Sequence, residues 1–317
     1  MKIIIIPPHY RVLFALLAVT SALSLYATLV EAPFSYPVGS TITIPSGMTI
    51  AEAGAMLKQE HVIHSSVFFS LFVRVTGGTL IAGTYALPEK KTIFEIAYDL
   101  ERGITGIEQV RVTIPEGATN LEIAKILGIA LQPFDTQRFL TLAQPDEGYL
   151  FPDTYFLLPG TPPEQVIERM KQNFDFHIRP LEGELGSWKR SLKDAVIMAS
   201  IVEKEARKIE TRQVVAGILW SRVDSNMYLQ VDAVFGYIFQ KPTFSPSLDD
   251  LKVNSPYNTY THRGLPPGPI GNPGLDALKA AINPVQSPYL FYLTGKDGIM
   301  YYAKTFKQHL ANRAHLK

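Results

Sequence analysis

A glutamate in the second half of the chain combines an acidic side chain with an apolar position. The sequence around it predicts a helix over Leu192–Ala206 with one apolar stripe at helical spacing. The stripe is formed by Leu192, Ala195, Val196, Ala199, Val202 and Ala206. Glu203 lies on it, one turn after Ala199. Ionising a carboxyl group on an apolar face is costly, so the pKa of Glu203 is expected to rise. A carboxyl with a raised pKa can act as a general acid near neutral pH.

The other glutamate of this helix end is expected to point elsewhere. Glu205 lies two positions after Glu203. Two positions turn its side chain about 200° around the helix, away from the site of Glu203. The alternative for Glu203 is a structural role at the helix end, paired with Lys204 or Arg207.

A loop rich in proline and glycine, Asn254–Ile270, carries the residue types that bind sugars. Proline stiffens such a loop, while amides, hydroxyls and aromatic rings can hydrogen-bond to sugars or pack against them. The candidate substrate-binding residues here are Tyr257, Asn258, Thr259, Tyr260, Arg263, Leu265, Pro266, Pro267 and Ile270. The alternative is a plain linker, because paired prolines and repeated glycines usually mark one.

Two shorter segments add further candidates. The first, 147–155, mixes acids with aromatic rings and offers Glu147 and Tyr149 for a sugar groove, or else packs a domain junction. The second, 229–233, offers Gln230 and Asp232. Asp232 is the candidate for a second carboxylate in this domain, and its alternative role is a structural cap.

A pattern that recurs three times predicts the elements before these segments. In each copy Thr follows Pro by four residues, Glu follows Thr by three, and Leu follows Thr by eight; the Thr–Glu pairs are Thr49–Glu52, Thr92–Glu95 and Thr119–Glu122. The Thr is expected to cap a helix and the Glu to complete a capping box. Each copy therefore predicts a strand–turn–helix unit. Together they predict a compact α+β region from about residue 40 to 135, either a scaffold or a glycan-binding module.

The second half of the chain predicts different elements. Helices are expected over Gln165–His177 and Leu192–Val223, the latter as two helices that meet near residues 209–212. Further on we expect a long loop over 242–273, a hairpin of 289–293 with 300–303 around Lys296-Asp297-Gly298, and a final helix over 305–315.

The N-terminus predicts export. Val12–Val30 is an uncharged, mostly apolar run of 19 residues, long enough to cross a bilayer as a helix. Lys2 and Arg11 precede it and Glu31 follows, which places residues 1–11 in the cytoplasm and the rest outside. A cleaved signal peptide is the alternative.

Composition narrows the function classes. The 30 Lys and Arg balance 29 Asp and Glu, so no global charge favours nucleic acid. The chain has no cysteine, which excludes disulfides, thiolate nucleophiles and cysteine-type zinc sites. No glycine-rich phosphate loop and no His-x-x-x-His pair is present. We therefore expect no metal and no organic cofactor.

Four of these segments, in this order, resemble the MltG or YceG-like family of endolytic murein transglycosylases. Ala199–Glu205 resembles the catalytic motif of that family, whose first glutamate falls at Glu203. Tyr257–Pro273 resembles its most distinctive loop, Glu147–Tyr155 its entry segment, and Ala303–His309 its C-terminal strand and helix. The resemblance covers roughly residues 30 to 317. Val231 is a departure, since the family often has Ser or Thr there and a valine side chain cannot donate a hydrogen bond to a substrate.

The resemblance implies an architecture and an activity. The expected architecture is α+β: a transmembrane helix over 12–30, a LysM-like α+β domain over 40–138 and a catalytic domain over 140–317. The expected reaction cleaves the β-1,4 bond between N-acetylmuramic acid and N-acetylglucosamine inside peptidoglycan strands, without hydrolysis, and leaves 1,6-anhydro ends. Glu203 would be the single acid/base, and Gln230, Asn258 and Tyr260 would orient the sugar.

The resemblance also implies a place and partners. The chain would sit in the cell membrane with its catalytic domain outside the cytoplasm. It would act on nascent peptidoglycan strands and limit their length, with glycan polymerases of cell-wall synthesis nearby. Two rivals remain: a hydrolytic muramidase that uses Glu203 and Asp232 with water, and a non-catalytic peptidoglycan-binding scaffold tethered to the membrane.

Overall fold

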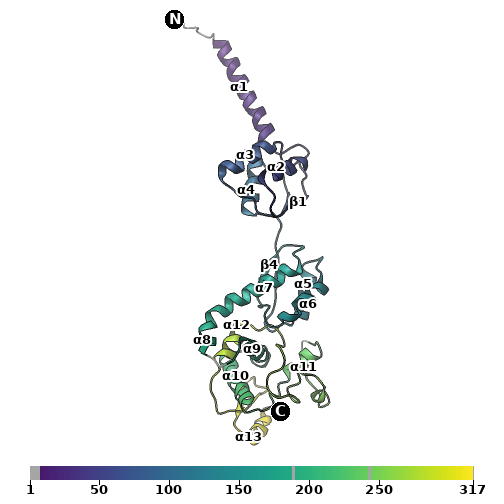
Figure 1. The fold of residues 1–317 in the computed structure, drawn as a ribbon, viewed down its shortest axis with the longest axis vertical. Coiled ribbons are helices and arrows are strands. Elements are labelled where there is room, and N and C mark those ends of the chain that lie inside the picture. The colour runs from purple at the N-terminus through teal and green to yellow at the C-terminus, as the bar shows by residue number, and fades with distance from the viewer. Residues whose placement is uncertain (1–7, 188–189, 242–243, 317) are drawn as a thin grey trace. The chain divides into compact units, whose positions relative to one another are not determined.

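The computed structural model describes residues 8–187, 190–241 and 244–316. The chain divides into two compact units, Met1–Glu108 and Gln109–Lys317. Among the described residues the strands form three antiparallel pairs: β1 with β2, β3 with β4 and β5 with β6. Helices make up most of the rest, which agrees with the expected α+β class (Figure 1).

In its described residues, 8–108, the first unit is built from two strands and four helices. Its elements are α1 (Pro8–Leu29), β1 (Thr41–Ile44), α2 (Ile50–Gln59), α3 (Ser66–Thr76), β2 (Gly83–Ala86) and α4 (Ile93–Arg102). Ile42 and Tyr85 lie opposite each other in the β1–β2 pair and both are buried. Their side chains join those of α2, α3 and α4 in one apolar core.

The predicted membrane-spanning segment, 12–30, falls largely on α1, while most of the predicted cytoplasmic N-terminus lies outside the described residues. Within the part of the chain that the structure describes, no helix is long and apolar enough to cross a membrane.

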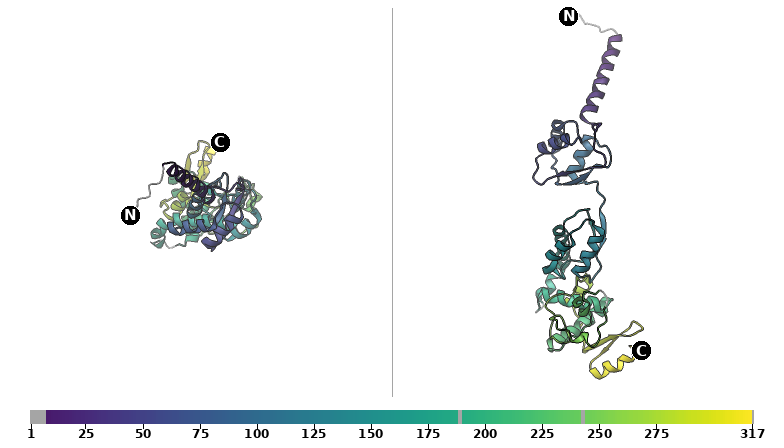
Figure 2. Two further views of the ribbon diagram at one scale, coloured as in Figure 1. Left: turned by 90° about the horizontal axis from the view of Figure 1, so that it is seen from above. Right: turned by 90° about the vertical axis from the view of Figure 1, so that its right-hand side faces the viewer.

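The second unit carries the remaining elements. In chain order they are β3 (Val110–Thr113), α5 (Asn120–Ala130), α6 (Thr136–Ala143), η1 (Gln144–Asp146), β4 (Thr154–Leu157), α7 (Pro163–Ile178), η2 (Arg179–Leu181), α8 (Glu182–Ser187), α9 (Leu192–Glu205), α10 (Ile209–Asp224), α11 (Ala233–Ile238), η3 (Asp250–Lys252), α12 (Leu275–Ile282), β5 (Phe291–Thr294), β6 (Met300–Ala303), α13 (Phe306–Asn312) and η4 (Arg313–Leu316). The expected pair of helices near residue 209 and the expected hairpin are confirmed by α9, α10, β5 and β6. Figure 2 shows the hairpin and α13 side by side, in yellow.

The three predicted capping boxes are confirmed. The side chains of Thr49, Thr92 and Thr119 each accept a hydrogen bond from the backbone amide of the glutamate three residues on. The backbone amide of each threonine in turn donates to the carboxylate of that glutamate. These reciprocal bonds satisfy amides that a helix leaves unpaired at its first turn. The pattern therefore fixes the starts of α2, α4 and α5.

The division between the units differs from the domain boundary expected near residues 138–140. The third copy of the repeat belongs to the second unit, because β3 pairs with β4 and α5 packs on α6. The sequence pattern is the same in all three copies, so it could not show which core each copy would join.

One helix runs through the centre of the second unit. Every residue of α9 from Ala195 to Val202 is buried, and α9 packs against α10 and α12. Gly217 of α10 packs directly against the backbone of Val285. A Cβ at Gly217 would lie 2.0 Å from the carbonyl oxygen of Val285, so no larger side chain fits there. Ser191 begins α9 with a capping box, and the helix ends at Glu205, so both glutamates stand where it leaves the core.

Candidate active site

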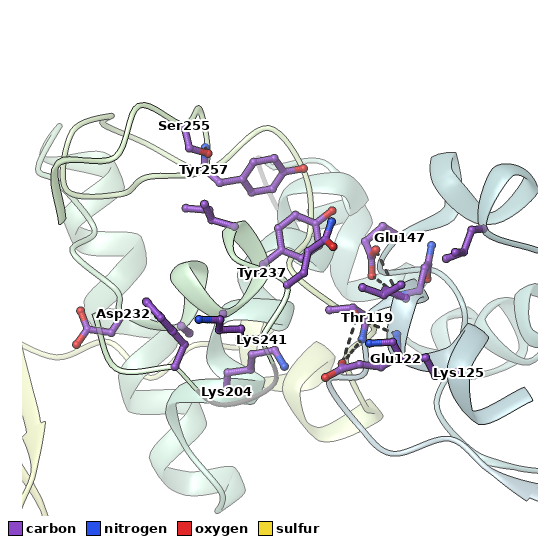
Figure 3. Close-up of a pocket in the computed structure, with 18 of the residues that line it drawn as sticks. Thr119, Glu122, Lys125, Glu147, Lys204, Asp232, Tyr237, Lys241, Ser255 and Tyr257 are labelled. Carbon is purple, nitrogen blue, oxygen red and sulfur yellow. Dashed lines mark hydrogen bonds between the residues drawn. The ribbon is translucent and has the colours of Figure 1, made fainter. Parts of the chain in front are cut away.

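A cavity of about 930 Å³ opens in the second unit beside the end of α9. Its walls come from the start of α5, from Glu147, from Lys204 and Glu205, from the segment around α11, and from Ser255 and Tyr257 (Figure 3). The volume lies toward the upper end of the range for ligand pockets. Acids, lysines and tyrosines share these walls, so the cavity suits a polar ligand.

Glu205 brings a protonatable carboxyl to this cavity. Burial raises its pKa to about 7, and the nearby charge of Asp232 acts in the same direction. The Tyr292 hydroxyl of β5 donates a hydrogen bond of 3.0 Å to Glu205 Oε2 and, with the Ala233 amide and Arg222, opposes the rise. A carboxyl with a pKa near 7 can both give and take a proton at neutral pH.

Glu203, the predicted acid/base, does not line this cavity. One of its oxygens accepts a hydrogen bond of 3.0 Å from the Gly274 amide, and the other forms an ion pair with Arg212. The side chains of Glu203 and Arg212 are only 6% and 7% exposed. Burial raises the pKa of Glu203, as expected, while the amide and the guanidinium oppose that rise. The structure thus pairs Glu203 with Arg212 and not with Lys204 or Arg207, and it buries the contact that the structural alternative expected to be partly exposed.

Glu147 lines the cavity at the start of α5. The Asn120 amide donates a 3.1 Å hydrogen bond to Glu147 Oε1, and burial raises the pKa of Glu147 to about 7. Asn272 holds this corner together: its side chain donates to Ala118 O and Asn120 Oδ1 and accepts from the Leu150 amide. Glu147 is therefore a second protonatable carboxyl, fixed by backbone contacts.

Asp232 also lines the cavity, but in a more exposed place. The Tyr260 hydroxyl donates a 2.6 Å hydrogen bond to Asp232 Oδ1, which places Tyr260 behind the carboxylate. Neighbouring Gln230 does not line the cavity; it adopts a φ of +50°, and its amide donates to Thr259 O. Glu205 and Asp232 thus line one cavity, whereas the predicted pair of carboxylates was Glu203 with Asp232.

The predicted sugar-binding loop contributes mainly structure. Asn258 is fully buried, and its side-chain amide donates to Leu251 O and Val253 O. Thr259 bonds to the Val231 backbone. Of the loop candidates, Tyr257 alone lines the cavity, where its ring lies 4.9 Å from that of Tyr237.

The remaining candidates lie away from the cavity walls. The Ile270 amide donates to Ser200 Oγ in the core, and Arg263 donates to Asn226 O. Leu265 packs on the core, Pro266 is buried and Pro267 is exposed. Tyr149 packs against the ring of Phe174. These residues support the loop, which in turn holds Tyr257 and Tyr260 in place.

Several cavity residues were not predicted. They are Glu205, Tyr237, Lys125, Lys204 and Lys241. The signal for Glu205 was present, since it ends the same helix as Glu203, but helical spacing alone could not show which side of α9 would face open space. Tyr237 and Lys241 follow from α11, an element that was not predicted.

Comparison with known proteins identifies the family of the chain. The model of the YceG-like family matches residues 42–315. A Bacillus subtilis protein named endolytic murein transglycosylase is 30% identical over 84% of this chain and 82% of its own length. A Streptococcus pneumoniae protein of the same name is 29% identical over 86% of this chain, which spans 58% of the length of that relative.

A solved structure extends the likeness to the fold. A crystal structure of a YceG-like protein from Listeria monocytogenes superposes with a TM-score of 0.60 at 30% identity. It covers 86% of this chain and 99% of that protein. The chain therefore belongs to the YceG-like family.

Proposed function

We propose that this chain is an endolytic murein transglycosylase. It cleaves the β-1,4 bond between N-acetylmuramic acid and N-acetylglucosamine inside peptidoglycan strands. The observation that carries the proposal is Glu205, a carboxyl with a pKa of about 7 on the wall of a cavity of about 930 Å³. The names of the relatives support the substrate class. We assign the acid/base role to Glu205 in place of Glu203, because Glu205 faces the cavity.

Glu205 serves both halves of the reaction. In its protonated form it gives its proton to the glycosidic oxygen as the bond to the anomeric carbon breaks. As a carboxylate it then takes the proton of the muramoyl C6 hydroxyl, whose oxygen bonds to the anomeric carbon and closes a 1,6-anhydro ring. The nucleophile belongs to the substrate, so this chemistry needs no second carboxylate, unlike that of most glycosidases. Holding the C6 hydroxyl near the anomeric carbon supplies much of the rate through proximity.

Other cavity groups support substrate binding. Tyr237 and Tyr257 present aromatic rings on one wall, and Lys204 and Lys241 add ammonium groups (Figure 3). Tyrosine rings offer apolar faces that can pack against sugar rings, while their hydroxyls can hydrogen-bond. These groups replace Asn258 and Gln230 as the residues that orient the sugar.

Hydrolysis is the second candidate reaction. Asp232 lines the same cavity, and its charge raises the pKa of Glu205. A pair of carboxyls of this kind can protonate the leaving oxygen and activate a water, as in many glycosidases. The product then carries a reducing end instead of an anhydro ring.

We further propose that the segment 12–30 anchors the chain in the cell membrane with its catalytic unit outside the cytoplasm. Support comes from the uncharged sequence of this segment and from large apolar side chains of α1 that are exposed, Leu23 and Phe14 among them. In that place the enzyme acts on nascent strands, limits their length and works beside glycan polymerases. Membrane fractionation of cells that express the full chain tests this: recovery in the soluble fraction would contradict it.

Mass spectrometry of purified, uncrosslinked glycan strands after incubation tests the reaction. Wild type is compared with Glu205→Gln, and with Glu210→Gln as a control at an exposed position on α10. Anhydro-muramoyl products from wild type and control, but not from Glu205→Gln, support the proposal. Reducing ends would favour hydrolysis and make Asp232→Asn the next variant. Binding of strands without cleavage by any variant would favour the scaffold alternative.

A further inference from the structure

We propose that Arg212 is a positioning residue that holds the chain on both sides of Glu205 and so fixes the direction in which Glu205 faces the cavity. The inference rests on the proposed role of Glu205 and names a residue that does not itself line the cavity. It also gives Glu203 a function: Glu203 is the side chain by which Arg212 holds the final turn of α9.

Two separate nitrogens of Arg212 make the two contacts. The Nε atom donates a 2.9 Å hydrogen bond to the backbone carbonyl of Ala206, the residue after Glu205. A terminal guanidinium nitrogen donates to the carboxylate of Glu203, two residues before Glu205. Arg212 itself sits in the first turn of α10 and is 7% exposed. One planar side chain thus bridges the end of α9 and the start of α10.

The bridge is needed because α9 ends abruptly. The last carbonyls of a helix have no partner within the helix. Ala206 already has extended backbone angles, φ −144° and ψ 145°, so the chain leaves the helix at the residue after Glu205. The bond from Arg212 satisfies the Ala206 carbonyl at this exit. Without it the final turn, which carries Glu205, would be free to fray.

Glu203 ties the same turn to two other segments. Its second oxygen accepts the Gly274 amide just before α12, and its Cγ would lie 3.2 Å from a Cβ at Gly117. A Cβ at Gly274 would lie 2.1 Å from a side-chain oxygen of Glu116, so a larger residue there would require the Glu116 side chain to move. Glu116 in turn lies 3.8 Å from Arg212. The pair therefore locks the end of α9 against three segments at once.

The guanidinium is suited to this task in a way that lysine is not. Arginine presents several donors in a rigid plane, while lysine presents one ammonium nitrogen on a flexible stem. Arg212→Lys therefore keeps a positive charge beside Glu203 but cannot reach Glu203 and Ala206 in the same geometry. Catalytic groups must be held within about 0.5 Å of the productive geometry, and a displacement of about 1 Å can lower a rate about 100-fold.

Steady-state kinetics on strands of defined length tests the proposal, with the full chain throughout. Arg212→Lys should lower kcat by about 10-fold to 100-fold and leave KM nearly unchanged, because the residues that hold the strand stay in place. The matched control is Arg138→Lys, which alters an exposed arginine–glutamate pair of the same unit and should leave both constants unchanged. Wild-type kcat in Arg212→Lys would overturn the proposal.

A second variant covers the case in which Arg212→Lys does not fold. Glu203→Met/Arg212→Met removes the whole pair without leaving a buried charge, and such replacements commonly keep a fold stable. It should melt cooperatively and still lose kcat to the same degree. A folded double variant with wild-type kcat would overturn the proposal.

An NMR titration separates this inference from the proposed function. The side-chain carboxyl carbon (Cδ) signal of Glu205 in glutamate-labelled protein is identified by its loss in Glu205→Gln. In wild type it should titrate near the pKa of about 7, and in Arg212→Lys at a lower pH, because a loosened side chain is better solvated. The readout needs no substrate, so if wild type cleaves nothing, an unchanged titration in Arg212→Lys still overturns the positioning role.

Discussion

The two sides of the end of α9 hold glutamates two residues apart in opposite surroundings. On one side Glu203 is closed in, neutralised by Arg212 and bonded to a backbone amide. On the other side Glu205 faces the cavity and is held by the neutral hydroxyl of Tyr292. Both carboxyls are desolvated, but only Glu205 is among the residues that line the cavity. Desolvation alone therefore does not identify an acid catalyst; it must coincide with open space.

The largest difference between the two sides should appear in turnover. Glu205→Gln removes the proton that the leaving oxygen needs and should lower kcat by about 100-fold to 10,000-fold. Glu203→Gln keeps the Glu205 carboxyl and weakens only the contact through which Arg212 positions it, so it should lower kcat less. Single-turnover cleavage of labelled strands measures both. A larger loss of kcat in Glu203→Gln than in Glu205→Gln would restore Glu203 as the acid/base.

Stability should rank the two sides in the opposite order. Arg212→Met leaves Glu203 buried and uncompensated, and breaking a buried pair in this way costs about 3 to 5 kcal/mol of unfolding free energy. Urea unfolding, followed by circular dichroism, measures the loss. Glu205→Gln breaks no ion pair and removes a carboxyl whose ionisation burial opposes, so it should not lower the unfolding free energy. Equal losses of unfolding free energy in Arg212→Met and Glu205→Gln would mean that the Glu203–Arg212 pair stabilises the fold no more than Glu205 does.

Acidity should separate the two sides again. Since the pKa of Glu205 is about 7, the protonated form that starts the reaction is lost as pH rises through 7, and kcat/KM should fall there. The raised pKa also means that the folded state binds protons more tightly than the unfolded state. Its contribution to stability is therefore full below the ordinary glutamate value of 4.5 and is lost as pH rises towards 7, by about 3 kcal/mol.

Thermal melting from pH 4 to pH 8 measures this contribution. Glu147 has a pKa of about 7 as well, so the wild-type slope contains both groups. Glu205→Gln should remove part of the slope and Glu147→Gln another part. A slope that neither variant changes would contradict the raised pKa values.

The sequence predicted this region in part, and the reason is geometric. Capping boxes, the α9–α10 break and the β5–β6 hairpin depend on residues close together in the chain, so local spacing revealed them. The choice between Glu203 and Glu205 depends on Gly274, Tyr292 and the segment around α11, which lie far along the chain. Helical spacing shows which residues share a side of α9, but not which side meets a cavity.

The loop candidates illustrate the same limit. Asn258 has the side chain of a sugar ligand, yet its amide caps the carbonyls of Leu251 and Val253. A tight loop without regular structure leaves backbone groups unpaired, and a buried Asn can satisfy them. Composition therefore predicted that this loop is functional. Which residue lines the cavity (Tyr257) and which one stabilises the loop (Asn258) depends on tertiary contacts that composition does not show.

The smallest expected effect concerns the hydrogen bond from the Tyr292 hydroxyl to Glu205. Tyr292→Phe removes a 3.0 Å hydrogen bond that favours the ionised carboxylate, at a cost of about 0.5 to 1.5 kcal/mol. The pKa of Glu205 should therefore rise further, and the alkaline limb of the kcat/KM profile should move to higher pH. Tyr301→Phe on the neighbouring strand β6 is the matched control, because the Tyr301 hydroxyl bonds to exposed Asp297 in the turn between β5 and β6 and the change should leave the limb in place. If the limb stayed fixed in Tyr292→Phe as well, Tyr292 would serve only to pack β5 against α9, and burial alone would set the acidity of Glu205.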